Sequence, residues 1–129
     1  MDEKFLNLAI KEAQKSKEPI KCGVVIVKGN KVLAKAFNNQ RNSYNASAHA
    51  EINAIKKAGA KLKNKDLIGA TIYCSCEPCV MCLTAITYAK IKKIVYKQKL
   101  KAVSAEIPVN IDLQLFLQRI NFDLEVKQL

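Results

Sequence analysis

Four of the five cysteines of this chain lie within nine residues, in the stretch CSCEPCVMC at 74–82. Cysteines grouped this closely are typical of zinc sites, iron–sulfur clusters and disulfide frameworks. The run C-x-C-x₂-C-x₂-C differs from the ferredoxin spacing, which weakens the iron–sulfur interpretation. Cys79 and Cys82 form a C-x₂-C pair near the predicted start of a helix, where partial positive charge favours thiolates. This pair could be half of a zinc site, whose other ligands must come from elsewhere in the chain.

His49 is the only histidine of the chain, and it lies in the tripeptide HAE directly before Ala50 and Glu51. A histidine and two cysteines would give a metal three protein ligands and leave a fourth position for water, which is the arrangement of catalytic zinc sites. A neighbouring glutamate could collect the proton of that water. A lone histidine is more often a core residue, so the joint occurrence of H-x-E and P-C-x-x-C carries the prediction.

The elements that must position these residues follow from hydrophobic periodicity and from turn and cap residues. Ser47 is a credible N-cap for one helix, which Gly59 would end, and Pro78 suits the first turn of another. Asn110 could cap a third helix. The predicted order is a helix over 3–16, the hairpin strands GVVIVK and KVLAKAF around Gly29-Asn30, a polar loop over 38–47, a helix over 48–58, a strand ATIYC, a helix over 78–89, a strand KKIVYK, a helix over 111–120 and a last strand in FDLEVKQL.

This order predicts an α/β fold. Strands that alternate with helices imply parallel strands joined by crossover helices, and hence a three-layer helix/sheet/helix sandwich with a mixed five-stranded sheet. A length of 129 residues without a linker predicts a single domain over 1–129. One crossover unit can bring two helix starts together at one edge of the sheet, so we expect His49 to approach Cys79.

The net charge of +11 comes from 20 lysines and two arginines against 11 acidic residues. Proteins that recognise phosphates or bases favour arginine, so a solvated lysine-rich surface is the first interpretation and RNA binding the second. Apolar runs such as GVVIV are too short to span a bilayer, and the acidic N-terminus lacks the form of a signal peptide. We therefore expect no membrane partner and a cytoplasmic location, where disulfides are disfavoured.

H-x-E followed by P-C-x-x-C is the signature of zinc-dependent base deaminases. The stretches NASAHAEINAIKKA and IYCSCEPCVMCLTAI resemble the cytidine/deoxycytidylate deaminase superfamily, and most of all its guanine deaminase and tRNA-adenosine deaminase branches, over about residues 3–98. The resemblance implies a cytidine-deaminase-like fold with Zn²⁺ as cofactor. It also implies roles for residues of this chain: His49, Cys79 and Cys82 as zinc ligands, Glu51 as the catalytic acid and base, and Asn38 and the backbone N–H of Ala50 as contacts to the base. Cys74 and Cys76 are then not expected to be ligands.

The substrate is less well defined by the sequence. The cysteine in SCEPC resembles the guanine branch, and the end of the chain at Leu129 leaves no room for a further C-terminal helix, so we expect a small nucleobase or nucleoside, with a guanine-like purine first. Glu106 is a candidate for reading the guanine edge. The alternatives are a tRNA-specific adenosine deaminase, a cytosine or cytidine deaminase, and a non-catalytic basic zinc module that binds RNA. Members of this fold are generally dimers, so we expect a homodimer, with LQLFL as a candidate interface.

Overall fold

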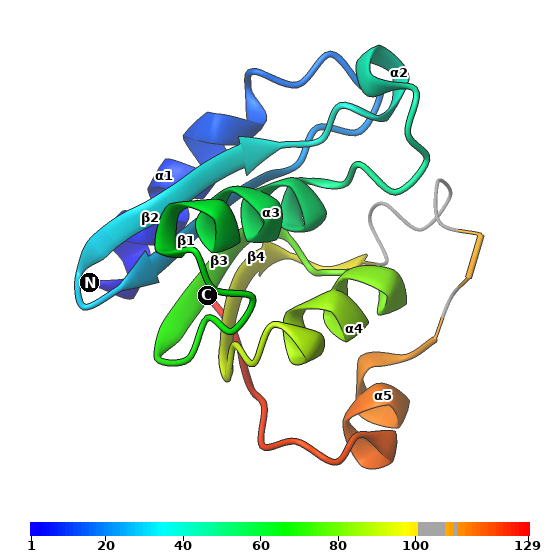
Figure 1. Ribbon diagram of the computed structural model, residues 1–129. Helices are drawn as coiled ribbons and strands as arrows, with labels where there is room; N and C mark the ends of the chain where they lie inside the picture. The colour runs from blue at the N-terminus through cyan, green and yellow to red at the C-terminus, as the bar shows by residue number, and fades with distance from the viewer. Residues whose placement is uncertain (101–107, 110) are drawn as a thin grey trace.

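The computed structural model describes residues 1–100, 108–109 and 111–129. Its sheet has five strands in the order β2-β1-β3-β4-β5 (Figure 1). Strand β1 pairs antiparallel with both of its neighbours, whereas the β3–β4 and β4–β5 pairs are parallel. The strands are β1 (Gly23–Lys28), β2 (Lys31–Phe37), β3 (Ala70–Cys76), β4 (Lys93–Gln98) and β5 (Glu125–Gln128). The mixed five-stranded sheet predicted from the sequence is confirmed.

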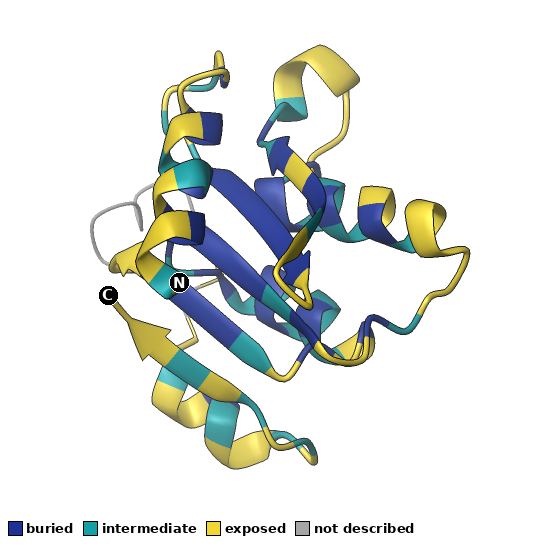
Figure 2. Ribbon diagram, turned by 90° about the vertical axis from the view of Figure 1, so that its left-hand side faces the viewer, coloured by how far each residue is buried: buried dark blue, intermediate teal, exposed yellow. Residues whose placement is uncertain are grey.

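Helices cover both faces of this sheet, because the residues of β1 alternate between two separate apolar clusters. Phe5 and Ala9 of helix α1 (Asp2–Ala13) pack with Val25 on one face. On the other face, residues of α3 (Ala50–Leu62) and α4 (Val80–Tyr88) pack with Val24 and Ile72, and α5 (Leu113–Arg119) adds Phe116. The central strands are accordingly buried (Figure 2). The predicted three-layer α/β sandwich is confirmed, whereas the single domain over 1–129 stays a prediction.

Several predicted element boundaries are wrong by a few residues. Helix α3 is capped by His49 rather than Ser47, because the Ser47 hydroxyl bonds the Asn45 side chain instead. Gly59 lies within the helix, which continues to Leu62 and ends at Lys63. Its interior position is tolerated since a glycine costs only about 1 kcal/mol relative to alanine there.

The other boundary differences concern the starts of helices. Helix α4 begins at Val80 with Cys79 as its N-cap, so Pro78 precedes the helix. Asp112 caps α5 by accepting a hydrogen bond from the backbone N–H of Gln114, and the predicted cap Asn110 lies outside the described residues. The predicted polar loop contains the short helix α2 (Gln40–Ser43).

The topology also places the starts of α3 and α4 at the same edge of the sheet. Strand β2 runs in the same direction as β3, since β1 is antiparallel to both. The chain leaves β2 and β3 at the same edge and enters α3 and α4 from there (Figure 1). None of the helices in the parts of the chain described above is long and apolar enough to span a membrane.

Candidate metal centre and pocket

The two helix starts bring together the residues that the sequence singled out. His49 is the N-cap of α3, Cys79 is the N-cap of α4, and Cys82 lies in the first turn of α4. Both N-caps have extended backbones, so their side chains turn across the ends of the helices. The partial positive charge of two helix N-termini favours anionic ligands at this position. The predicted approach of His49 to Cys79 and Cys82 is confirmed.

The distances within this group fit a tetrahedral metal ion. The Nδ1 atom of His49 lies 3.7 Å from Sγ of Cys79 and 3.5 Å from Sγ of Cys82. Zn–S bonds of about 2.3 Å and Zn–N bonds of about 2.0 Å at tetrahedral angles would separate sulfur and nitrogen by about 3.5 Å. Among the described residues, His49, Cys79 and Cys82 are the group whose ligand atoms lie close enough together, within 4.8 Å of one another, to hold a metal. Neither Cys74 nor Cys76 belongs to it.

The protonation of this group favours a thiolate. Hydrogen bonding from the Cys82 thiol, and secondly from His49, lowers the pKa of Cys79 to about 4. The same contact with Cys79, together with burial, raises the pKa of Cys82. Hydrogen bonding to Cys79 also raises the pKa of His49. Since the thiolate is the form of cysteine that binds metal, the lowered pKa of Cys79 favours metal binding at this position.

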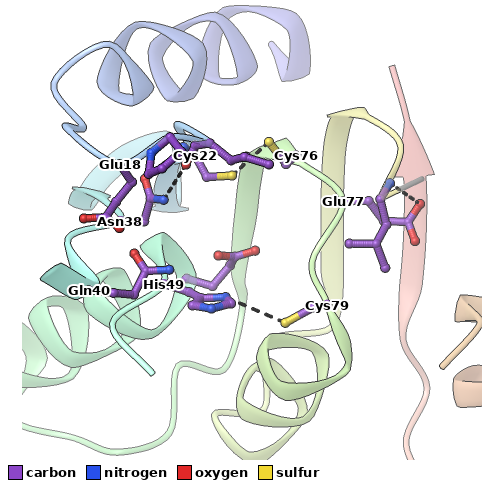
Figure 3. A pocket seen from close by; sticks show the side chains of 12 residues that line it. Glu18, Cys22, Asn38, Gln40, His49, Cys76, Glu77 and Cys79 are labelled. Atoms are coloured by element: carbon purple, nitrogen blue, oxygen red, sulfur yellow. Dashed lines mark hydrogen bonds between the residues drawn. The ribbon is translucent and has the colours of Figure 1, made fainter. Parts of the chain in front are cut away.

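Glu51 lies beside this centre and is enclosed by protein. Only 5% of the residue is exposed, and burial raises the pKa of its carboxyl group to about 7. A carboxyl group with a pKa near the working pH can both accept and donate a proton during one reaction. Glu51 lines the same pocket as His49 and Cys79, which are labelled in Figure 3. The arrangement is that expected of a general acid and base beside a metal.

The pocket itself is small, with a volume of about 80 Å³. Pockets that enclose a drug-sized ligand measure about 300–1,000 Å³. One aromatic ring can enter such a space, while the remainder of a larger substrate must lie outside it. The side chains of Glu18, Cys22, Gln40, Cys76 and Leu100 also line the pocket.

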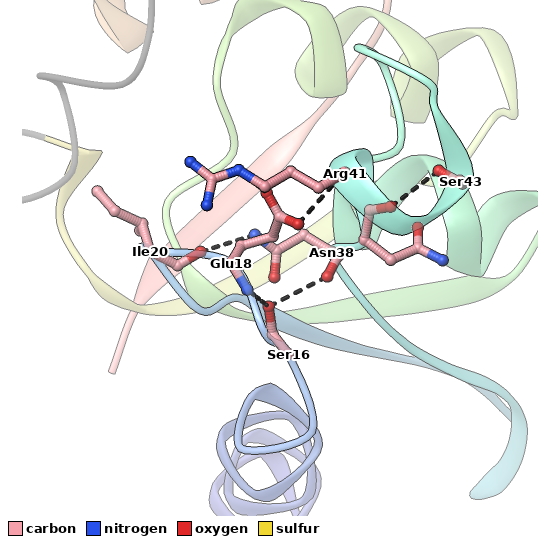
Figure 4. Close-up of polar contacts among 7 residues, drawn as sticks. Ser16, Glu18, Ile20, Asn38, Arg41 and Ser43 are labelled. Atoms are coloured by element: carbon pink, nitrogen blue, oxygen red, sulfur yellow. Dashed lines mark hydrogen bonds and ion pairs between the residues drawn. The ribbon is translucent and has the colours of Figure 1, made fainter.

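Asn38 lines the pocket as predicted, but its amide also holds a loop. Its Oδ1 accepts a hydrogen bond of 2.9 Å from the backbone N–H of Cys22, and its Nδ2 donates one of 2.7 Å to the carbonyl of Ile20 (Figure 4). A primary amide has two N–H donors and two acceptor lone pairs, so one of each remains for a substrate. Asn38 therefore fits both a structural role and the predicted contact to a base.

The other predicted site residues have different outcomes. Ala50 is fully buried. Because it is the first residue of α3, its backbone N–H has no acceptor within the helix. Glu106 lies outside the described residues. Glu77 accepts a hydrogen bond from the backbone N–H of Leu100 and so fastens the chain beyond β4.

Sequence reasoning missed Glu18, Cys22 and Gln40 as residues of the pocket. Cys22 is the fifth cysteine, and its Sγ lies 2.9 Å from that of Cys76. The one signal in the sequence was that Cys22 lies outside the cysteine cluster at 74–82. Glu18 lies in the loop after α1 and Gln40 begins α2, and no spacing in the sequence indicates that these two segments meet.

Comparison with known proteins identifies the family. The family described as the cytidine and deoxycytidylate deaminase zinc-binding region matches residues 1–98. The chain belongs to this family. Membership confirms the expected class of zinc-dependent deaminases and Zn²⁺ as the cofactor that His49, Cys79 and Cys82 could hold.

Relatives within this deaminase family include curated proteins that act on tRNA. The chain is 35% identical over 129 residues to a tRNA-specific adenosine deaminase of Streptococcus pyogenes serotype M1, covering 96% of this chain and 72% of that protein. It is 36% identical over 96 residues to a tRNA-specific adenosine deaminase of Aquifex aeolicus, covering 73% of this chain. The chain spans 64% of the length of the Aquifex protein.

Two solved structures extend the comparison. One comes from a study of A-to-I editing by tRNA:A34 deaminases at the wobble position of transfer RNA, with a TM-score of 0.84, 28% identity, and coverage of 98% of this chain and 91% of that one. The other is guanine deaminase from Bacillus subtilis, with a TM-score of 0.76, 33% identity, and coverage of 92% and 76%. These matches confirm the cytidine-deaminase-like fold, and they include both branches that the sequence resembles.

Proposed function

We propose that this deaminase-family chain hydrolyses the exocyclic amine of adenosine within tRNA, producing inosine and ammonia. The observation that carries the choice of substrate is the 35% identity to a tRNA-specific adenosine deaminase along 96% of the chain. The guanine-like substrate that the sequence favoured has weaker support, because the two relatives described above are both named as acting on tRNA. Guanine deaminase remains the second candidate, on the strength of the 33% identity to the Bacillus subtilis enzyme.

The chemistry follows from the positions of the residues. His49, Cys79 and Cys82 would hold the zinc ion, which would supply a Lewis acid for the activation of water. Glu51 takes one proton of the attacking water on its carboxylate and gives it to the ring nitrogen. It then takes the proton of the newly added hydroxyl group and gives it to the departing amine, so both protons of the water are accounted for. The buried surroundings of Glu51 keep bulk water away from these transfers. The remaining N–H and lone pair of the Asn38 amide orient the base, and the N–H of Ala50 at the start of α3 binds developing negative charge.

A basic rim supports a polyanionic substrate. Lys17, Lys21, Arg41 and Lys99 are exposed, and each directly neighbours a pocket residue in the sequence, namely Glu18, Cys22, Gln40 or Leu100. Because the pocket holds little more than a ring, the phosphates of an RNA would lie outside it, near these side chains. Lysine and arginine near phosphates contribute affinity that falls as salt concentration rises. In this proposal, the rim gives part of the +11 net charge a role in RNA binding, which was the second interpretation of the sequence after a solvated lysine-rich surface.

The test is inosine formation by the zinc-loaded protein on a tRNA and its anticodon stem-loop, with ammonia release from free guanine and cytosine measured in parallel. We expect turnover of the RNA and none of the free bases. Glu51→Gln serves as the control, since it should retain zinc and lose turnover. Turnover confined to guanine would replace the proposal with the second candidate. RNA binding without ammonia release would favour the non-catalytic zinc module.

A matched pair of variants tests the basic rim. One variant replaces Lys17, Lys21 and Lys99 together by glutamine. This variant should bind RNA more weakly, and the magnitude of the slope of log affinity against log salt concentration should fall by about three. The control replaces Lys56, Lys61 and Lys63, which are exposed in or directly after the C-terminal half of α3. At a rise of about 1.5 Å per residue, these lysines lie about 10 to 20 Å along the helix axis from His49 at its start. Equal losses in both triple variants would contradict a role for the rim.

The homodimer is likewise a proposal. Helix α5 buries Phe116, yet 43% of Leu115 and 37% of the nearby Ile111 are exposed. This surface fits the dimer interface that LQLFL suggested. Light scattering on the purified protein would give the mass directly, and a monomer at enzyme concentrations would contradict the proposal.

A further inference from the structure

The wall of the pocket contains a second pair of thiols, Cys22 and Cys76, which the proposed reaction does not use. The Cys22 thiol donates a hydrogen bond of 2.9 Å to Sγ of Cys76, and the two sulfur atoms face each other in Figure 3. Cys22 directly precedes β1, and Cys76 is the last residue of β3. Both side chains line the pocket that contains Glu51.

The register of the sheet places this pair directly opposite each other. Strands β1 and β3 are antiparallel with Val24 opposite Cys74, so two further steps place Cys22 opposite Cys76. Opposite residues of antiparallel strands have Cα atoms about 4.5–5.5 Å apart. Disulfides join Cα atoms about 4.4–6.8 Å apart, so the backbone already satisfies the separation that a bond requires.

We propose that Cys22 and Cys76 form a reversible disulfide in the pocket wall, with a small disulfide such as oxidised glutathione as the oxidant. Cys22 reacts first, because it is half-buried and reached through the pocket, whereas only 5% of Cys76 is exposed. Once the Cys22 proton has moved along the hydrogen bond to Cys76, the Cys22 thiolate attacks one sulfur of oxidised glutathione, forming a mixed disulfide and releasing one glutathione thiolate. The Cys76 thiolate then attacks the Cys22 sulfur and displaces the second. The two released glutathione thiolates take up the two protons that the protein loses and become two glutathione thiols. Two cysteines are thus oxidised and one glutathione disulfide is reduced.

The bond would act on the substrate pocket through Asn38. The backbone N–H of Cys22 donates to Oδ1 of Asn38, and the backbone N–H of Asn38 donates 3.2 Å to the carbonyl of Cys22. Closing the distance between the two sulfur atoms from 2.9 Å to the bonded length of about 2.05 Å shifts Cys22, and through these two hydrogen bonds it shifts the amide that would orient the base. We expect turnover to fall several-fold on oxidation and to return with dithiothreitol. This effect on turnover rests on the proposed function, whereas formation of the bond does not.

The experiment treats zinc-loaded protein with mixtures of oxidised and reduced glutathione, blocks free thiols and digests with trypsin without reduction. Cys22 lies in the tryptic peptide 22–28, and Cys76 lies in peptide 66–90 together with Cys74, Cys79 and Cys82. We expect these two peptides to be joined, with the mass of the intact protein lowered by two hydrogen atoms. The bound zinc should be retained, since its proposed ligands are not consumed.

Two variants assign the bond within peptide 66–90. Cys76→Ser should abolish the joined peptides, whereas Cys74→Ala, which alters the fully buried neighbouring cysteine on β3, should preserve them. Three outcomes would each overturn the proposal. These are joined peptides in Cys76→Ser, release of zinc in step with cross-linking, and glutathione that stays attached to Cys22 without the second step. Because these readouts are masses and metal content, an inactive protein would count against the proposed function alone.

Discussion

Among single residues, spacing in the sequence predicted the metal centre but not the pocket around it. The joint occurrence of H-x-E and P-C-x-x-C predicted roles for His49, Glu51, Cys79 and Cys82. A crossover unit brings together the two helix starts that carry these motifs. Cys22 was not identified, because its partner Cys76 is 54 positions away and only the strand register joins them. The dual engagement of Asn38 was also hidden, since its contacts with Ile20 and Cys22 depend on how a loop folds back.

Replacing Glu51 separates chemistry from metal binding. Glu51→Gln preserves the size of the buried side chain but cannot accept a proton, so we expect turnover to fall by at least about 10²-fold, a typical contribution of general acid–base catalysis. Zinc content, measured by atomic spectroscopy, should equal that of the wild type. Substantial turnover in fully zinc-loaded Glu51→Gln would remove Glu51 from the proposed role.

Replacing Asn38 should lower stability as well as activity. Asn38→Ala leaves the N–H of Cys22 and the carbonyl of Ile20 without their partners, and each unsatisfied buried group costs about 1–3 kcal/mol. We expect the free energy of unfolding in urea to fall by about 2 kcal/mol. Asn42→Ala, an exposed residue in α2, is the control and should change it by less than about 0.5 kcal/mol. Equal stability of both variants would mean that Asn38 does not hold the loop.

For helices and strands, periodicity predicted every long element, and errors were confined to their ends. Whether Ser47 or His49 caps α3 depends on the competing bond from Ser47 to Asn45, which is a matter of loop conformation. The sequence also did not predict how closely the helices pack against the strands. The pattern GVVIVK predicted a strand, yet it gave no sign that α1 lies directly on its first residue, Gly23.

Gly23 should be required for the contact between α1 and β1. A Cβ atom at Gly23 would clash with the backbone of α1 at Ala9 O and Ala13 N, and backbone atoms cannot yield as a flexible side chain would. We expect Gly23→Ala to lower the free energy of unfolding by at least about 2 kcal/mol, through overpacking. Gly29→Ala is the matched control, because Gly29 has φ of +57° but open space around it. Backbone strain alone should cost it about 1–2 kcal/mol, so a larger loss in Gly29→Ala than in Gly23→Ala would contradict the packing explanation.

Across the whole molecule, Asp2 connects the first helix to three strands. Its Oδ1 accepts a hydrogen bond of 2.7 Å from the Tyr73 hydroxyl of β3, and its Oδ2 pairs with Lys93 of β4 at 3.1 Å and Lys127 of β5 at 3.4 Å. These contacts join both ends of the chain to the sheet. No sequence pattern indicates them, because the partners lie 71, 91 and 125 positions away.

The contacts of Asp2 predict a specific dependence of stability on pH. Hydrogen bonding from Tyr73, and then from Lys93, lowers the pKa of Asp2 from 3.8 to about 2. A carboxyl group whose pKa is lower in the folded state stabilises the fold above its unfolded pKa, and this contribution is lost as pH falls from about 4 towards 2. Because water screens this partly exposed group, the contribution should be roughly 1 kcal/mol. Asp2→Asn should therefore unfold at lower urea concentration than the wild type at pH 6, and the two midpoints should converge between pH 4 and pH 2.5. The control is Glu3→Gln, which removes an exposed charge in the same helical turn. If the difference between the midpoints of Asp2→Asn and the wild type stayed constant down to pH 2.5, the ionised carboxylate would not connect α1 to the sheet.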